Sequence, residues 1–368
     1  MQRFQSLFVQ KQKRAARLRK IRPVRIFIWR LRIFVRPRRI FPACSIINSG
    51  KQRYLSVFRR NLLILALLIM ACLKTMAQYD PSFSHYWTMQ TSFNPAAVGK
   101  QDKINVTAAY NMSLVGFTHN PKTMYASADM PFYFIGAYHG VGLQFTNDAI
   151  GLFTNNNVAL QYAYRQKLFG GMLAIGLQGS MLSENFDGSK LDIIDDGDEA
   201  LTKSEIKGSA FDLAAGLYYQ HRSWYVGASV KHLTAPTVEL GETSEQKIDM
   251  SYYLTAGCNI RLRNPFLSIQ PSVLGRSNGD VYRADITTRL TYTHEQRMMY
   301  VGVGYSPQNS VSVFLGGFFH GITLGYSYEA FTNGISLGNG SHELFVGYQT
   351  DVNLFKKGRN RHQNVRIL

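Results

Sequence analysis

Apolar and polar residues alternate in short runs along residues 78–368, and this period of two predicts β-strands. In one such run Val158, Leu160 and Tyr162 alternate with smaller or more polar residues. No window in this region shows a convincing helical period over ten or more residues. The predicted strands are 104–114, 122–130, 139–147, 157–167, 171–184, 209–220, 224–233, 249–262, 266–277, 281–293, 298–306, 311–319, 321–330 and 341–352.

The number, lengths and connections of these strands favour a membrane barrel over a soluble sandwich. There are fourteen strands, and most are close to the ~9–11 residues that a tilted strand needs to cross a bilayer. Short connections follow even-numbered strands: 169–170, 222–223, 263–265, 295–296 and residue 320. Long ones follow odd-numbered strands (185–208, 234–248 and 331–340), although 131–138 is longer than this rule predicts. We therefore predict an all-β fold, a transmembrane antiparallel up-and-down β-barrel of about 14 strands.

The two faces of the predicted strands differ in chemistry. One face is apolar and keeps Tyr, Trp and Phe near the strand ends, as an interfacial aromatic girdle does. The other holds Gly, Ser, Thr, Gln and isolated charges, which are costly in a dry core but can pair or stay hydrated in a polar lumen. The charges form a candidate lumen network: Arg165, Asp212, Lys231, Arg283, Asp285, Arg289, Glu329 and Asp351. Cys258 is in phase with the apolar face, and we expect a β-bulge at Pro271.

The strong positive charge of the chain belongs to its first 77 residues. The whole sequence has 41 Lys and Arg against 23 Asp and Glu, a net charge of +18. Residues 1–77 hold 19 of the basic residues and none of the acidic ones, which leaves 22 basic and 23 acidic residues in the remainder. The body of the protein is therefore close to neutral, and we predict no nucleic-acid partner for it.

Residues 55–77 have the features of a secretory signal peptide. The apolar run 61–73 is too short for a transmembrane helix, follows two arginines and precedes two small residues. We predict export through the Sec pathway, with cleavage after Ala77. A lipoprotein with its lipid on Cys72 and a twin-arginine signal are the alternatives.

The chain divides into five predicted parts. These are a basic extension (1–54), the signal peptide (55–77), a plug-like or periplasmic segment (78–101), the barrel (102–352) and a basic periplasmic tail (353–368). The extension is either an arm for nucleic acid or membrane, or upstream sequence translated from a misplaced start, and we favour the second interpretation. The tail returns to the side on which the barrel begins, because the number of strands is even.

Two motifs follow the predicted cleavage site, and a third lies farther on. The first two read Gln78-Tyr79-Asp80-Pro81-Ser82-Phe83-Ser84-His85-Tyr86 and Phe93-Asn94-Pro95-Ala96-Ala97-Val98-Gly99, and Val115-Gly116-Phe117 and Pro121-Lys122-Thr123 come later. Together they resemble the start and first hairpin of the PorP/SprF family of outer-membrane components of the type IX secretion system. The candidate partner contacts from this resemblance are Asp80, Pro81, Phe83, Ser84, Tyr86, Phe93, Asn94, Pro95, Gly99, Gly116, Pro121, Lys122 and Thr123.

The resemblance implies a non-enzymatic barrel in the outer membrane of a Gram-negative bacterium, which scaffolds export or surface attachment of secreted proteins such as adhesins. The implied partners are outer-membrane lipid, periplasmic ring components and a secreted cargo protein or adhesin. Residues 78–101 then either seal the lumen or contact a periplasmic partner. A passive or hydrophobic-ligand channel is the alternative function, since fourteen strands enclose more space than side chains fill.

The sequence holds no recognisable catalytic, cofactor or metal motif. The nine histidines are scattered, and neither HExxH, a P-loop nor a nucleophile elbow occurs. We predict no catalytic residue, no cofactor and no metal site. The acidic run 192–199 does not have EF-hand spacing, and we interpret it as a solvated outer loop, with a calcium site as the alternative.

Overall fold

The computed structural model describes residues 80–188, 205–240, 244–279, 281–332 and 339–351. The predicted extension, signal peptide and C-terminal tail lie outside these residues, as does the acidic run 192–199. The strands are β1 (Lys103–Met112), β2 (Lys122–Phe134), β3 (Ala137–Ile150), β4 (Phe153–Leu168), β5 (Gly171–Asp187), β6 (Glu205–Gln220), β7 (Trp224–Lys231), β8 (Thr237–Leu240), β9 (Ser244–Lys247), β10 (Ser251–Cys258), β11 (Ile260–Arg261), β12 (Leu267–Ser277), β13 (Tyr282–His294), β14 (Arg297–Ser306), β15 (Ser310–Phe319), β16 (Ile322–Phe331) and β17 (Ser341–Asp351). Two 3₁₀ helices, η2 (Gln90–Ser92) and η3 (Pro95–Ala97), precede them. Within this part of the chain, no helix is both long and apolar enough to cross a membrane.

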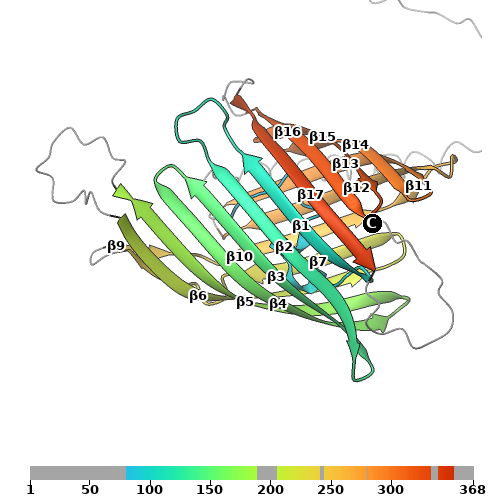
Figure 1. Cartoon of the computed structure of the whole chain (residues 1–368), viewed down its shortest axis with the longest axis horizontal. Coiled ribbons are helices and arrows are strands. Elements are labelled where there is room, and N and C mark those ends of the chain that lie inside the picture. Colours follow the sequence, from blue (N-terminus) through green and yellow to red (C-terminus); the bar gives the residue numbers. More distant parts are fainter. Residues whose placement is uncertain (1–79, 189–204, 241–243, 280, 333–338, 352–368) are drawn as a thin grey trace, which may run out of the picture. The chain divides into compact units, whose positions relative to one another are not determined.

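The main sheet is a closed antiparallel barrel (Figure 1). Consecutive strands pair from β1 to β7, β7 pairs with β10, and the order continues from β12 to β17. β17 pairs with β1, and β10 pairs with β12, so the sheet closes on itself. β10 and the two-residue β11 are two parts of one barrel strand, which gives fourteen strands around the barrel. The predicted fold is confirmed.

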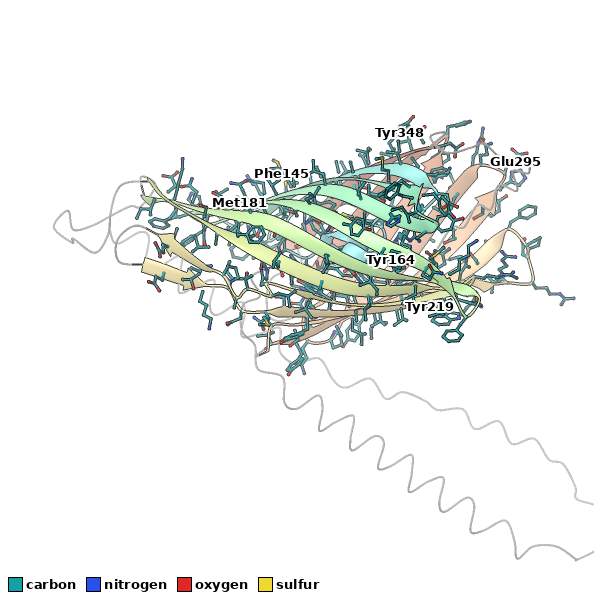
Figure 2. The ribbon with its side chains drawn as sticks, turned by 90° about the horizontal axis from the view of Figure 1, so that it is seen from below. Phe145, Tyr164, Met181, Tyr219, Glu295 and Tyr348 are labelled. Carbon is teal, nitrogen blue, oxygen red and sulfur yellow. The ribbon has the colours of Figure 1, made fainter. Side chains whose placement is uncertain are left out.

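The alternation in the sequence separates an apolar outer face from a polar inner one. Leu160 and Leu177 are 67% and 60% exposed, and Figure 2 shows side chains such as those of Phe145 and Met181 on the outside of the ribbon. Their inward-facing neighbours, for example Gln161, are almost fully buried. A protein dissolved in water rarely exposes apolar side chains in such number, so this outer face suits lipid.

The connection between β2 and β3 is much shorter than the predicted 131–138. β2 continues to Phe134 and β3 begins at Ala137, which leaves a two-residue turn, 135–136. Pro131 lies within β2, beyond the last pair with β1 at Asp129, so β2 has one free edge there, a position at which a strand tolerates proline. We call the end of the barrel with this turn and the turns 169–170 and 295–296 the turn end, and the opposite end the loop end.

A second correction concerns the predicted loop 234–248, which contains a small hairpin. β8 pairs with β9 outside the main sheet, and the hairpin packs against β5 and β6. Val238, Leu240 and Ile248 are buried there with Leu182 of β5. Strands of four residues are too short to show a period in the sequence. The hairpin covers inward-facing residues of β5 and β6 at the loop end.

The predicted bulge at Pro271 is absent from the described ladder. β12 keeps one register with β10 and β11, with Gly257 opposite Ser272 and Ile260 opposite Ile269. The pairing is interrupted between these two positions, where Pro271 lacks the N–H for a ladder bond. The chain therefore accommodates the proline by a gap in pairing and not by an extra residue.

Candidate functional site

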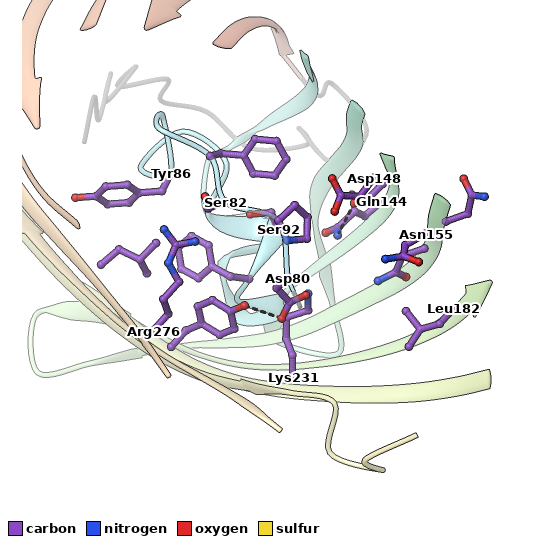
Figure 3. Close-up of a pocket in the computed structure, with 18 residues that line it drawn as sticks. Asp80, Ser82, Tyr86, Ser92, Gln144, Asp148, Asn155, Leu182, Lys231 and Arg276 are labelled. Atoms are coloured by element: carbon purple, nitrogen blue, oxygen red, sulfur yellow. Dashed lines mark hydrogen bonds and ion pairs between the residues drawn. The ribbon is translucent and has the colours of Figure 1, made fainter. Parts of the chain in front are cut away.

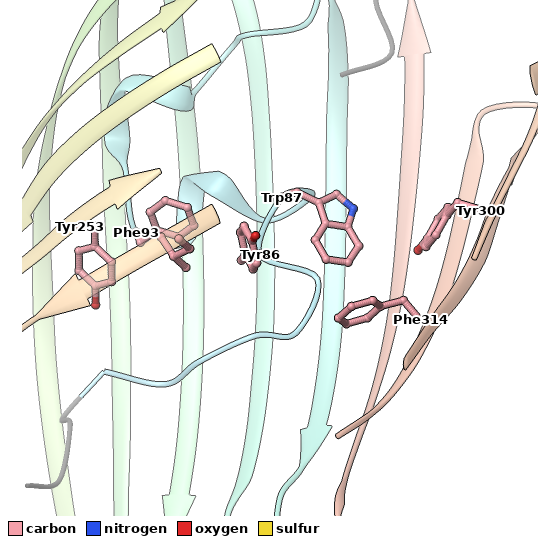
Figure 4. Packing of buried hydrophobic residues seen from close by; sticks show 7 residues of the cluster. Tyr86, Trp87, Phe93, Tyr253, Tyr300 and Phe314 are labelled. Carbon is pink, nitrogen blue, oxygen red and sulfur yellow. The ribbon is translucent and has the colours of Figure 1, made fainter. Parts of the chain in front are cut away.

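Residues 80–101, which we call the N-terminal segment, lie inside the barrel (Figure 4). They contact inward-facing residues around the circumference, on β2, β6, β13, β15 and β17 among others. A closed sheet of fourteen strands encloses more volume than its own side chains fill. The N-terminal segment occupies part of that volume.

The N-terminal segment runs from the loop end to the turn end. Asp80 lies beside Lys231 and Tyr253, where β7 ends and β10 begins at the loop end. Gly99 lies against Gly140, near the start of β3 at the turn end. The chain therefore crosses the lumen lengthwise before it enters β1.

The Asn-Pro-Ala motif docks on glycines of the barrel wall. Asn94 caps η3 by accepting a hydrogen bond from Ala96 N at 2.9 Å, and its side-chain amide donates to Leu217 O at 3.0 Å. A Cβ atom on Gly216 would lie 2.1 Å from Asn94 Oδ1, and one on Gly176 would lie 2.2 Å from Ala96 N. We call the wall glycines whose Cβ positions would lie within 3.0 Å of the motif the glycine seat: Gly140, Gly176, Gly216 and Gly227. Only glycine permits so close an approach of segment and wall.

The motif ends with Gly99 and Lys100 at the turn end. Gly99 has a φ of +65°, which favours glycine, and its N–H donates to a carboxylate oxygen of Asp129 at 2.9 Å. Lys100 donates to Gln90 Oε1 at 2.8 Å. Burial lowers the pKa of Lys100 to about 8. This end of the segment is therefore held by steric fit and by the hydrogen bond from Gly99 to the wall residue Asp129, while Lys100 bonds to Gln90 within the segment.

Aromatic side chains hold the middle of the N-terminal segment (Figure 4). Tyr86, Trp87 and Phe93 from the segment pack with Tyr253, Leu274, Tyr300 and Phe314 of the wall. The hydroxyl of Tyr86 lies 3.0 Å from Thr287 Oγ1 and 3.1 Å from Ser272 Oγ, and burial raises its pKa. The guanidinium of Arg289 lies over the ring of Trp87, 4.2 Å from the ring centroid, at cation–π distance.

A carboxylate of the last strand binds the backbone of the first motif. Glu343 of β17 accepts hydrogen bonds from Ser84 N at 2.6 Å and His85 N at 2.9 Å. The Nδ1 atom of His85 lies 2.7 Å from the same carboxylate. Phe83 is buried beside them and packs on Tyr125 with ring centroids 5.3 Å apart. These contacts tie the N-terminal segment to the strand that closes the barrel.

Asp80 is held at the loop end by three donors of the barrel wall. Its carboxylate lies 2.5 Å from Lys231 Nζ, 2.7 Å from the hydroxyl of Tyr253 and 3.3 Å from His232 Nε2. The other ring nitrogen of His232 lies 2.9 Å from Asp212. We call the group formed by Asp80, Lys231, His232 and Tyr253 the latch.

Charge pairing in the latch offsets the cost of burial. Burial alone would raise the pKa of Asp80, but Lys231 and His232 hold this pKa well below its usual range. Burial would lower the pKa of His232, but the charge of Asp80 and the hydrogen bonds to Asp80 and Asp212 raise this pKa to about 8. The latch is therefore an ionic contact between the N-terminal segment and the wall.

The residues of the predicted lumen network fall into separate groups. Arg283 pairs with Asp285 at 3.0 Å and with Glu329 at 3.1 Å. Arg276, which the sequence did not point to, also pairs with Asp285. These four residues form one group on β12, β13 and β16. Asp285 and Arg289 do not form a pair, because Arg289 faces Trp87 instead.

Other members of that predicted network lie elsewhere. Lys231 and Asp212 belong to the latch or contact it, whereas Arg165 donates to the carbonyl of Lys100 at 3.2 Å. The prediction needs correction for Asp351, which is exposed at the end of β17. Its side chain is in the inward phase of the strand, but the strand has reached the rim of the barrel there.

The third motif lies at the loop end, in the connection between β1 and β2 and at the start of β2. Its candidate contact residues are Gly116, Pro121, Lys122 and Thr123. Gly116 has a φ of +102° and faces Asn339, whose side-chain amide donates to Val115 O at 2.8 Å. Pro121 O accepts from Ser113 N at 2.9 Å, Lys122 is exposed, and Thr123 donates to Asp148 at 2.6 Å. These residues order the loop and are separate from the contacts of the N-terminal segment described above.

Several residues of the site were not singled out from the sequence. They are the four seat glycines, Glu343, Tyr253 and His232. The glycines carried a signal, since they recur at inward positions of neighbouring strands, but nothing local pairs them with Asn94. Among the described residues, no group of three or more His, Cys, Asp or Glu side chains is arranged to hold a metal ion.

Several solved structures are similar to this barrel. CdiB from Acinetobacter baumannii has a TM-score of 0.33 and 7% identity, with 67% of this chain and 60% of that chain covered. The Ralstonia pickettii toluene transporter TbuX has a TM-score of 0.40 and 11% identity, with 76% and 96% covered. A Pseudomonas aeruginosa FadL homologue has a TM-score of 0.41 and 12% identity, with 70% and 92% covered.

The family comparison covers most of the sequence. No curated protein matches it. The family model described as "Type IX secretion system membrane protein PorP/SprF" matches residues 75–348, a range that includes all three motifs, the N-terminal segment and nearly the whole barrel. The resemblance found in the sequence is thereby confirmed, and the chain belongs to the PorP/SprF family of type IX secretion system membrane proteins.

Proposed function

We propose that this outer-membrane barrel is a closed, non-enzymatic scaffold of the type IX secretion system, which holds other proteins in position and does not conduct solutes. The observation that carries the proposal is the occupation of the lumen by the N-terminal segment, which is bound to the wall at both ends and in the middle. A lumen crossed by a bound segment in this way leaves the two ends of the barrel as the surfaces for function.

The turn end offers exposed apolar side chains that support a binding role. Ile135 is 84% exposed and Phe169 is 87% exposed, and both have a φ of 45°. Each precedes a glycine with positive φ, as in the type I′ turns that favour Asn-Gly. A β-branched or bulky residue is an outlier at such a φ. Strained residues that display apolar surface to solvent are more readily explained by a partner than by stability.

The orientation of the barrel decides which partner each end meets. In an outer-membrane barrel the short turns face the periplasm and the longer loops face outward. We infer that Ile135 and Phe169 contact periplasmic ring components of the secretion system. The loop end would then meet the secreted cargo protein or adhesin, and residues 55–77 would direct the chain to the Sec pathway before it enters the outer membrane.

A pull-down from outer membranes, with mass spectrometry of the recovered proteins, tests the scaffold. The wild-type barrel should recover ring components, and the variant with Ile135→Asn and Phe169→Asn should lose most of them. Asn-Gly is the preferred type I′ turn, so this variant keeps or improves the fold of the barrel. Glu295→Asn, in a turn at the same end, is the matched control and should recover ring components normally. A wild-type barrel that recovers no ring component would contradict the proposal.

Conductance in planar bilayers separates the scaffold from the channel. The wild-type barrel should insert with little or no steady conductance, whereas a variant without residues 80–98 should conduct when it inserts. A large steady conductance of the wild-type barrel would overturn the closed scaffold and favour a passive channel.

A further inference from the structure

The three donors of the latch form a site that is complementary to one carboxylate. Lys231, His232 and Tyr253 all belong to the barrel wall, and all three are buried. Their donor atoms converge on the two oxygens of Asp80 within 2.5 to 3.3 Å. An ammonium, an imidazole and a phenol in this arrangement bind a carboxylate by charge-assisted hydrogen bonds. The three contacts that hold Asp80 all use its side chain, so the anion is recognised separately from the rest of the segment.

Three residues of the latch, Asp80, Lys231 and Tyr253, line a vestibule at the loop end (Figure 3). The vestibule has an empty volume of about 690 Å³, is open to solvent, and has a wall of polar side chains from β3 and β4. Figure 3 shows Gln144, Asp148 and Asn155 on one side of this space and Asp80 with Lys231 on the other. This volume includes open solvent, so the vestibule is a hollow at the mouth of the barrel and not an enclosed cavity.

The polar wall of the vestibule has hydrogen-bond acceptors without donors. Among the described residues, the side-chain oxygens of Asn155 and Asn157 are buried and have no hydrogen-bond partner. Glu184 lies opposite Asn155 on β5 and is 2% exposed. One of its carboxylate oxygens is also buried and has no hydrogen-bond partner. Buried polar atoms are normally satisfied. These oxygens have almost no accessible surface, so their side chains must turn toward the vestibule before backbone N–H groups of a polypeptide can reach them.

We propose that the latch is a carboxylate-binding site that Asp80 occupies in the resting barrel, and that the carboxylate of an extended polypeptide entering the vestibule from the loop end takes its place. The wall amides would then accept hydrogen bonds from the backbone of the polypeptide. The inference deepens the proposed function, since it names the part of the barrel that contacts an exported chain. It also explains why the donors belong to the wall and the acceptor to the segment.

The exchange replaces one carboxylate by another and leaves no charge unpaired. Lys231 and His232 have side-chain exposures of 6% and 0%, so departure of Asp80 alone would strand buried positive charge. An incoming carboxylate removes this cost. The glycine seat and the aromatic cluster still hold residues 86–99, so only the first residues of the segment need to move.

Chemical rescue of Asp80→Ala in the purified, detergent-solubilised barrel tests the site itself. The variant should unfold at a lower temperature than the wild type, and acetate should restore most of the loss while chloride of equal ionic strength should not. Adding Lys231→Met to the variant should abolish the rescue. Failure of acetate to restore stability, or equal rescue by chloride, would overturn the carboxylate site.

Two labelled peptides of the same sequence, one with a free C-terminal carboxylate and one amidated, identify the ligand. Fluorescence anisotropy should show that the free carboxylate binds the Asp80→Ala barrel at least about tenfold more tightly than the amide, the effect expected for hydrogen bonds to a charged group. The wild-type barrel should bind both peptides more weakly, because Asp80 competes. Equal binding of the two peptides would overturn the polypeptide ligand. This assay uses the barrel alone, so a failed pull-down of ring components leaves its result unaffected.

Discussion

The two ends of the N-terminal segment are fixed by different physics. At the turn end the Asn-Pro-Ala motif lies directly on the glycine seat, where backbone atoms or the Asn94 side chain leave no room for a Cβ. At the loop end Asp80 is held by an ammonium, an imidazole and a phenol, and it lines an open vestibule. Steric fit of this kind is specific to one shape, whereas an ionic contact accepts any carboxylate that reaches it. The contrast indicates one permanent attachment and one exchangeable attachment.

The largest effect should come from filling the glycine seat. Gly176→Val places side-chain atoms where Ala96 N and Pro95 C now lie, 2.2 and 2.4 Å from the Cβ position. Neither backbone atom can move without displacing η3, so the cost should exceed about 3 kcal/mol of unfolding free energy. Chemical unfolding in detergent measures the loss, and protease sensitivity of residues 80–101 shows whether the segment has left the wall.

Gly179→Val is the matched control on the same strand. Gly179 faces outward, and the nearest atom to its Cβ position is a ring carbon of Phe211 at 3.6 Å, an ordinary contact. Its effect should stay within about 0.5 kcal/mol, as for surface substitutions in general. If both variants lose the same stability, the seat is no tighter than the rest of the wall and the comparison between the two attachments fails.

A smaller loss should follow from removal of Glu343. Glu343→Ala leaves two backbone N–H groups, those of Ser84 and His85, without an acceptor in a buried site. Unsatisfied buried donors cost about 1–3 kcal/mol each, and partial relaxation should limit the total to about 2–3 kcal/mol. Glu239→Ala, at an exposed position of the loop-end hairpin, is the control and should change little. Thermal unfolding in detergent should rank Gly176→Val, Glu343→Ala and Glu239→Ala in that order of loss.

The barrel itself could be predicted because its signal is local. The alternation of apolar and polar residues along each strand decides which side chains face lipid. Because each strand has its own alternating run, the strands can be counted from the sequence. Prediction failed where the local pattern was interrupted or too short. Pro131 looked like a strand end, but it sits where β2 has a free edge, and Pro271 interrupts the pairing without shifting the register. The four-residue strands of the β8–β9 hairpin are below the length at which a period is visible.

The contacts of the N-terminal segment could not be predicted in the same way. The motifs were visible, but their partners lie far along the chain: Ser84 and Glu343 are 259 positions apart, and Asp80 and Lys231 are 151 apart. The inward phase of Lys231 and Asp212 follows from alternation, whereas their height in the barrel relative to Asp80 depends on the path of the segment. The amino-acid composition also does not show in which direction the N-terminal segment crosses the lumen.

The two attachments should also change the stability of the barrel in opposite directions as the pH rises. This effect is smaller than those of the substitutions above. The pKa of His232 is raised to about 8 in the folded barrel, so its contribution is full below about pH 6.5, the pKa of an unperturbed histidine, and is lost as the pH rises to 8. The loss should be about 2 kcal/mol. Lys100, at the turn end, has a pKa lowered by burial to about 8, so stability should rise again above pH 8 as the folded state releases this proton before the unfolded state does.

Thermal unfolding of the barrel in detergent should therefore show a minimum near pH 8. His232→Gln should remove the fall between pH 6.5 and 8 and keep the rise, whereas Lys100→Met should keep the fall and remove the rise. Below about pH 4 both variants should lose stability, because Asp80, whose pKa the latch holds well below its usual range, becomes protonated. A profile that both substitutions change in the same way would mean that the two ends of the segment respond as one unit, and the latch would then have no freedom to exchange its carboxylate while the seat holds.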